Sequence, residues 1–241
     1  MTDLSNAPVE PGKAEPFYQI WIRALTRPEE RTFVEIAASP NANPNVAYLW
    51  LFLTGLVSSV ITFALQGASM QQIREFLPPE AAQALGPGQV GGMGLLGAIC
   101  GAPIAAAFGV LFFAILVGLI QLIAKMFGGT GDYARLVYTA ACIAAPLNLV
   151  SAVLTLLAAI PFIGILFGLV SMVVGIYGLF LYVSAVKGVN QFGWGQAAGS
   201  VLLPGVVIGC LCACLVGGAL ALIGPAVGNV FSTINQSLGT Y

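Results

Sequence analysis

The sequence predicts an all-α, polytopic membrane protein: a bundle of five transmembrane helices preceded by an interfacial amphipathic helix. Of its 241 residues, 59% are hydrophobic and only 7% are charged, whereas an ordinary soluble domain carries about 25% charged residues. Ten of the seventeen charged side chains lie within the first 35 residues, and the other seven lie between apolar runs or at their edges. Seventeen charged side chains are too few to cover the surface of a soluble fold of this size. A lipid bilayer must therefore surround most of the chain.

Residues 1–45 are predicted to form a cytoplasmic leader. Its start is rich in proline and small polar residues, a composition typical of disorder. Apolar residues at helical spacing predict an amphipathic helix over 17–37, with a break at Arg27 and Pro28. We expect this helix to lie in the membrane interface, with Trp21 at headgroup depth and Arg23 on another side. The alternative is a docking helix for a soluble partner.

Residues 46–224 are predicted to form the five-helix membrane domain. The spans are expected at about 46–65, 100–126, 133–158, 161–186 and 197–223. Each is long enough for a hydrocarbon core of about 30 Å. The second apolar run begins before its span, so residues 93–99 either extend the span or lie in the interface. Residues 225–241 form a short tail without charged side chains.

The turn between the second and third spans combines glycines with a pair of charges. Gly128, Gly129 and Gly131 end the second span. Asp132 suits the N-cap of the third, because a carboxylate is favourable at the positive end of a helix. Arg135 lies one turn further on, where it can reach lipid phosphate at the membrane interface.

The distribution of Lys and Arg predicts the orientation. Five spans place three segments on one side of the membrane: the leader, the turn between the second and third spans, and the turn between the fourth and fifth. This side holds seven of the eight basic residues, and only Arg74 lies on the other side. Cytoplasmic loops carry an excess of Lys and Arg. The N-terminus is therefore expected in the cytoplasm and the C-terminus on the extracytoplasmic side, in a bacterial inner membrane.

Small residues recur every three or four positions in three spans. Such stripes let helix backbones approach closely in lipid. We therefore expect the second, fourth and fifth spans to pack tightly, within one subunit or across a dimer. The expected helix-packing residues are Gly97, Gly101 and Gly109 in the second span, Gly164 and Gly168 in the fourth, and Gly205, Gly209, Ala213 and Gly217 in the fifth.

A polar stripe lies on one face of the third span, close to Pro146. It consists of Asn148, Ser151 and Thr155. Polar residues beside a helix break mark binding cavities in transporters. Alternatively, these side chains bond to neighbouring helices or repair the kink locally.

Composition argues against an enzyme, a metal site and a cofactor. Histidine is absent, and the five cysteines all lie inside apolar runs, where they serve as small apolar side chains. Cys212 would point away from Cys210 and Cys214 on a helix, which disfavours a metal site. The segment GGTGDY lacks the Lys-Ser/Thr pair of a P-loop. There is no basic patch for nucleic acid, and no catalytic residues are predicted.

Three segments resemble the Yip1-domain family of five-helix membrane proteins, in its bacterial branch. They are WIRALTRPEERTFVEIA before the first span, GGTGDYARLVYTAACIAAPLNL opening the third, and GIYGLFLYVSAVKGV ending the fourth. In order and topology the resemblance extends over about residues 17–224. Eukaryotic relatives reside in Golgi and endoplasmic reticulum membranes and interact with Rab GTPases through acidic N-terminal motifs, which this leader does not match. The resemblance implies no catalytic residues.

Two functions remain open at this stage. The first is a non-enzymatic scaffold or accessory subunit that binds membrane lipids and assembles, as a homo-oligomer or in a larger complex, through helix contacts. The second is a transporter or channel for a neutral or apolar solute passing Asn148. Ion-coupled transport is disfavoured because the spans contain no ionisable residue in their interiors.

The predicted orientation can be tested with reporter fusions at the two ends of the full chain. Alkaline phosphatase, which is active only outside the cytoplasm, should be active when fused after Tyr241 and inactive when fused before Met1. Activity at both ends, or at neither, would contradict an odd number of crossings.

Overall fold

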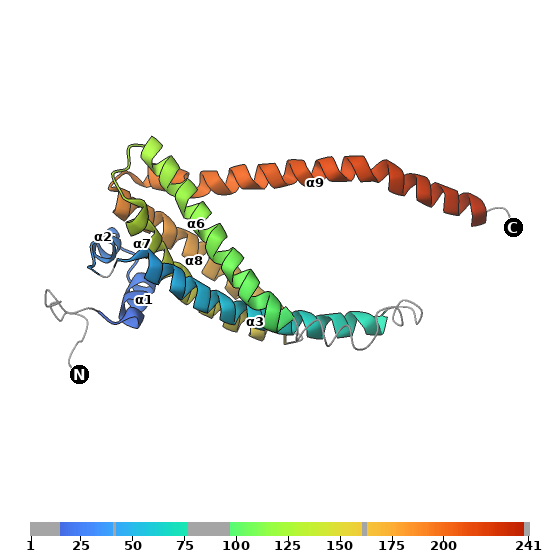
Figure 1. The fold of residues 1–241 in the computed structure, drawn as a ribbon, viewed down its shortest axis with the longest axis horizontal. Coiled ribbons are helices and arrows are strands. Elements are labelled where there is room, and N and C mark those ends of the chain that lie inside the picture. Colours follow the sequence, from blue (N-terminus) through green and yellow to red (C-terminus); the bar gives the residue numbers. More distant parts are fainter. Residues whose placement is uncertain (1–14, 41, 77–96, 161–162, 239–241) are drawn as a thin grey trace. The chain divides into compact units, whose positions relative to one another are not determined.

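The computed structural model is helical throughout its regular elements and describes residues 15–40, 42–76, 97–160 and 163–238. In chain order the elements are α1 (Phe17–Thr26), α2 (Glu30–Ala37), α3 (Pro44–Phe76), the π-helical turn η2 (Gly97–Gly101), α6 (Ala102–Met126), α7 (Tyr133–Ala158), α8 (Gly164–Asn190) and α9 (Trp194–Leu238) (Figure 1). The chain divides into two compact units, residues 1–200 and 201–241.

Five of these helices are long and apolar enough to cross a bilayer. The candidate spans are Pro44–Gln66, Ile99–Met126, Tyr133–Ala158, Gly164–Asn190 and Trp194–Ala219. The all-α fold with five apolar helices and shorter N-terminal helices is therefore confirmed for the described residues.

Two helices continue beyond the ends predicted from hydropathy. α3 runs to Phe76 although its span was expected to end at 65, and α9 runs to Leu238 through most of the predicted tail. Backbone hydrogen bonds sustain a helix whether or not its side chains are apolar, so the end of an apolar run does not mark the end of a helix. The leader before Glu15, the predicted start of the fourth span at 161 and the last three residues lie outside the described residues.

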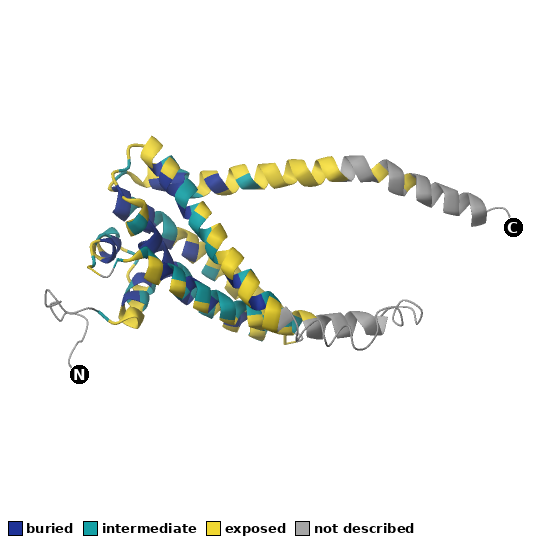
Figure 2. Ribbon diagram, in the orientation of Figure 1, coloured by how far each residue is buried: buried dark blue, intermediate teal, exposed yellow. Residues whose placement is uncertain are grey.

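α7 is the central helix of the first unit. In its most apolar window 50% of the residues are buried, compared with 22% or fewer in the other four candidate spans. It packs against α3, α8 and α6, and also against α1 and α2. Figure 2 shows the buried residues concentrated in α7 and at the end of the bundle where α1 and α2 lie.

Local sequence explains where α7 begins and α8 ends. The Asp132 carboxylate accepts a hydrogen bond from the Ala134 N–H at 3.1 Å, as predicted for an N-cap. Gln191 follows α8 in the left-handed conformation, at φ 54°, and its N–H bonds to the Lys187 carbonyl. This arrangement satisfies one of the last carbonyls of the helix.

The glycine turn between α6 and α7 is held by two buried amide side chains. Asn190, at the end of α8, accepts through Oδ1 from the Gly131 N–H at 3.2 Å and from Gln121 Nε2 at 3.0 Å. Its Nδ2 donates to Gln121 Oε1 at 3.2 Å and to the Val186 carbonyl at 3.1 Å. Gln121 also donates to the Gly131 carbonyl at 2.7 Å. Together these bonds tie the ends of α6 and α8 and the start of α7 to one another.

This clamp explains why the turn needs glycine. A Cβ at Gly129 would lie 2.7 Å from Asn190 Oδ1 and 2.9 Å from the Ala124 carbonyl oxygen. At Gly131 it would lie 2.7 Å from the same Oδ1 and from the Val189 carbonyl oxygen. Both glycines are required because the turn approaches fixed polar groups too closely for any side chain.

Replacing Asn190 tests the importance of the clamp. Asn190→Leu removes the hydrogen-bond partners of the Gly131 N–H and of Gln121, which stay buried, so the folded state should lose about 3 kcal/mol. The melting temperature of the detergent-solubilised protein, followed by size-exclusion chromatography after heating, should fall by several degrees. Gln191→Gly is the control: the residue is exposed with positive φ, so glycine should leave stability unchanged or slightly raised. Equal melting temperatures for Asn190→Leu and the parent would contradict the clamp.

Candidate functional site

The two N-terminal helices dock on the membrane helices through their apolar residues. Ile20 and Ala24 of α1 and Phe33 and Ile36 of α2 are buried. α1 packs against α7, whereas α2 packs against both α7 and α8. The amphipathic region predicted as a helix over 17–37 is thus two helices separated at Arg27–Glu29, and the faces that bury these side chains contact protein.

A glycine in α8 provides the closest contact with α2. A Cβ at Gly188 would lie 3.0 Å from the Glu30 carbonyl oxygen and 3.3 Å from Phe33 Cβ. The backbone of α2 therefore rests against α8 where α8 has no side chain, as is typical of helices packed in membranes.

A tyrosine of α8 fixes the end of α1. The Tyr177 hydroxyl donates to the Leu25 carbonyl oxygen at 2.6 Å. The last carbonyls of a helix have no partner within it, and the Pro28 nitrogen cannot donate. The hydroxyl of a membrane helix therefore satisfies a carbonyl that the end of α1 leaves free.

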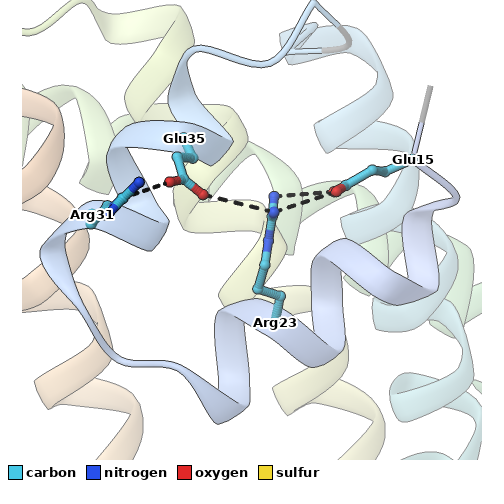
Figure 3. A network of polar contacts seen from close by, with 4 residues as sticks. All are labelled: Glu15, Arg23, Arg31 and Glu35. Atoms are coloured by element: carbon cyan, nitrogen blue, oxygen red, sulfur yellow. Dashed lines mark hydrogen bonds and ion pairs between the residues drawn. The ribbon is translucent and has the colours of Figure 1, made fainter. Parts of the chain in front are cut away.

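Charged side chains link α1 to α2, as Figure 3 shows. Arg23 on α1 pairs with Glu15 at 3.1 Å and with Glu35 on α2 at 3.9 Å. Arg31 pairs with Glu35 at 3.0 Å along α2. Arg23, predicted as a membrane-interface residue, is thus the centre of an ion-pair network whose carboxylates reach it from both sides.

One lysine connects α2, α8 and the start of α9. Lys187 on α8 forms an ion pair and hydrogen bond with Glu30. Its ammonium lies 4.9 Å from the centre of the Trp194 ring, within the range of a cation–π contact. Trp194 in turn stacks on Phe180 with ring centres 6.0 Å apart. The α8–α9 turn and the N-terminal helices thus lie at the same end of the first unit.

Trp21 packs within the protein in an aromatic cluster. Its ring meets Trp50 of α3 edge-on at 5.6 Å and Phe17 at 5.2 Å, and Trp50 also contacts Tyr138 of α7 at 5.6 Å. The exposed apolar residues of α1 are instead Phe17, Tyr18 and Ile22. The third predicted interface residue, Arg135, is exposed near the start of α7.

Two of the predicted packing glycines lie close to groups outside the second, fourth and fifth spans: Gly101 lies close to α3, and Gly164 to the end of α7. A Cβ at Gly101 would lie 3.1 Å from the Phe63 ring, so this glycine packs against α3. At Gly164 it would clash with the Ala158 carbonyl oxygen, so the end of α7 leaves no room for a side chain at the start of α8. Within the one chain described, α6 packs mainly on α3 and α8 on α7, and close packing of the second, fourth and fifth spans across a dimer stays a prediction.

The other predicted packing residues face open space. Nothing lies within 4 Å of a Cβ built at Gly109, Gly168, Gly205, Gly209 or Gly217. Ala213 in α9 is exposed as well. Gly97 belongs to η2, but its surroundings lie outside the described residues. Within its own unit, each of these small residues with nothing near its Cβ is open to a neighbouring helix.

The predicted polar stripe lies along the contact between α3 and α7. Asn148 Nδ2 donates to Thr54 Oγ1 at 3.5 Å, and Ser58 Oγ donates to the Asn148 carbonyl at 3.0 Å. Ser151 and Thr155 are exposed, and the Thr155 hydroxyl bonds to the Ser151 carbonyl of its own helix at 2.8 Å. The side chain of Asn148 thus makes an interhelical hydrogen bond and that of Thr155 a local one, whereas Ser151 takes part through its carbonyl.

The cysteines show no arrangement that holds a metal. Cys142 is buried, whereas Cys210, Cys212 and Cys214 are exposed along α9, and all are free thiols. Among the described residues, no group of three or more Cys, Asp or Glu side chains could hold a metal ion.

Sequence reasoning missed the residues that lock the turn and dock the N-terminal helices, chiefly Gln121, Asn190, Tyr177 and Gly188. Gln121 is a lone polar residue in an apolar run, which is a usable signal for a buried polar contact. Nothing in the sequence distinguishes Gly188 from the other 29 glycines of the chain.

One comparison with known proteins finds a match. A family model described as the Yip1 domain matches residues 22–216, which is most of the chain. No curated protein matches the sequence, and no solved structure matches the fold.

The docking of α2 can be tested at Gly188. Gly188→Leu would push against the Glu30 carbonyl and Phe33, so α2 should detach and trypsin should cleave faster at Arg31, whose side chain is 87% exposed. Gly175→Leu is the matched control, because it lies on the same helix and a Cβ there meets nothing within 4 Å. If both variants in mild detergent are cleaved at the parent's rate, α2 is not held at Gly188.

Proposed function

The chain belongs to the Yip1 domain family, and from this membership and its helices we propose that it acts as a non-enzymatic membrane scaffold. In this role it assembles with itself or with other subunits through helix–helix contacts and so contributes to membrane organisation or trafficking. Its membrane residence follows from five helices of spanning length and apolar composition.

One observation carries the proposal: small residues lie uncovered on apolar helices. Gly168 and Gly175 on α8 are exposed among large apolar residues such as Ile165 and Met172. On α9, Gly205 and Gly209 recur at a spacing of four residues with nothing within 4 Å of a Cβ. Lipid chains gain nothing from a gap between large side chains, whereas another helix backbone can approach closely there.

The exposed face of α1 supports an additional contact with lipid. Phe17, Tyr18 and Ile22 are each more than half exposed, on a helix that is attached to the membrane helices through Tyr177 and Trp50. Aromatic residues favour the headgroup region of a bilayer. We place this face of α1 in the interface, with Trp21 half-buried next to it against Trp50.

The orientation belongs to the same proposal. The leader, the α6–α7 turn and the α8–α9 turn carry most of the basic residues. Contacts join these segments: Lys187 pairs with Glu30, and Gln196 Nε2 donates to the Phe127 carbonyl at 3.2 Å. This basic end is proposed to face the cytoplasm of a bacterial cell.

Bulky substitution tests the scaffold function. Gly209→Leu should block close approach of another helix and shift the protein toward smaller assemblies, measured as the mass of complexes purified from native membranes in mild detergent. Val207→Leu is the control, because Val207 is 62% exposed on the same helix but is not one of the small residues. If Gly209→Leu and the corresponding change at Gly168 leave every assembly intact, the scaffold proposal fails.

A further inference from the structure

The seam between α3 and α7 contains an amide whose hydrogen bonding is incomplete. Asn148 Nδ2 makes one contact, to Thr54 Oγ1, at the long distance of 3.5 Å. Thr54 itself donates to the Trp50 carbonyl at 2.9 Å. Within the part of the chain that the structure describes, no group donates to Asn148 Oδ1. An asparagine side chain offers two N–H donors and an oxygen with two lone pairs, so most of this capacity is unused.

The depth of Asn148 in the membrane makes its unused hydrogen-bonding groups unfavourable in free energy. α7 runs from Tyr133 to Ala158, which places Asn148 about 15 Å along the helix from its end and further from its start. Its partner Thr54 lies in the interior of the Pro44–Gln66 span. At this depth a bilayer contains no water, and an unpaired polar group costs several kcal/mol. Asn148 is half-buried, so one side of it is open to whatever covers the seam.

The surface beside Asn148 has the features of a helix contact. Ser151 and Thr155 continue the same face of α7 and are exposed. Thr62 continues the face of Ser58 on α3 and is also exposed, with its hydroxyl bonded to the Ser58 carbonyl at 2.9 Å. Val57 and Leu156 are exposed apolar side chains that stand next to Ser58 and Thr155 in the sequence, about 100° around their helices from the polar strip. A polar strip with exposed apolar side chains beside it therefore lies on the surface of the first unit.

We propose that this seam binds a second copy of the chain, with the two Asn148 amides paired across a two-fold axis. The inference rests on the proposed scaffold function and names the partner and surface for it. An amide is self-complementary because it both donates and accepts, and a two-fold axis places equivalent residues opposite each other. Acyl chains carry no donor for Oδ1, whereas polar side chains hold helices together in lipid.

The first test measures dimer strength in liposomes of fixed lipid composition by single-molecule photobleaching of the full chain. Asn148→Leu should raise the dissociation constant about fivefold, the size expected for an interhelical polar contact in lipid. Asn148→Gln retains the amide and should recover part of the affinity. Val173→Leu is the control, because Val173 is 61% exposed on α8 but lies on another face from Gly168 and Gly175. Equal dissociation constants for Asn148→Leu and the parent would overturn the proposal.

The second test locates the interface independently of folding effects. In a chain whose five cysteines are replaced by alanine, Ser151→Cys should form a disulfide-linked dimer on mild oxidation, and Ser171→Cys should not. A dimer linked only through Cys at 171 would overturn this placement while keeping the scaffold function. A chain that is monomeric in liposomes and purifies without partners would overturn both. Reaction of Ser151→Cys with a membrane-impermeant thiol reagent would also overturn the dimer, because it would reveal a water-filled path.

Discussion

Hydrocarbon supplies no hydrogen-bond partners, and this constraint governs how the helices of the chain meet. Every polar group at membrane depth must find its partner within the protein or another protein. Burial inside the protein imposes the same demand at the turn end of the bundle, where the buried amides of Gln121 and Asn190 bond to each other and to the backbone of the glycine turn. Apolar packing alone would not choose among the many ways of placing apolar helices side by side, because lipid is as apolar as leucine. Directional bonds at the ends of α6, α7 and α8 reduce that choice.

The N-terminal helices show the same constraint in a different setting. α1 ends before a proline, which leaves carbonyls without partners, and the Tyr177 hydroxyl of α8 reaches one of them. α2 comes close to α8 where Gly188 has no side chain, and its Glu30 pairs with Lys187. These contacts attach α1 and α2 to α8.

Asn148 stands apart from these satisfied groups. Asn190 uses both ends of its amide within the chain, whereas Asn148 has one long contact to Thr54. The difference separates two roles for a polar residue in a membrane protein. A fully bonded amide holds one fold together, and an incompletely bonded one at the outer surface favours association.

The class of the protein, its five spans and the start of α7 can all be read from the order of its residues. Long apolar runs, charges confined to their edges and an aspartate after glycines act locally, so each can be read without knowledge of the neighbours. Which glycines are constrained, and which side chains surround Trp21, depends on how the helices pack. Gly188 and Gly131 are constrained by groups 158 and 59 residues away at Glu30 and Asn190, and Trp21 by Trp50. The sequence does not distinguish a glycine packed against a carbonyl of another helix from a glycine that faces lipid. The difference depends on the neighbouring helix, which is distant in the sequence.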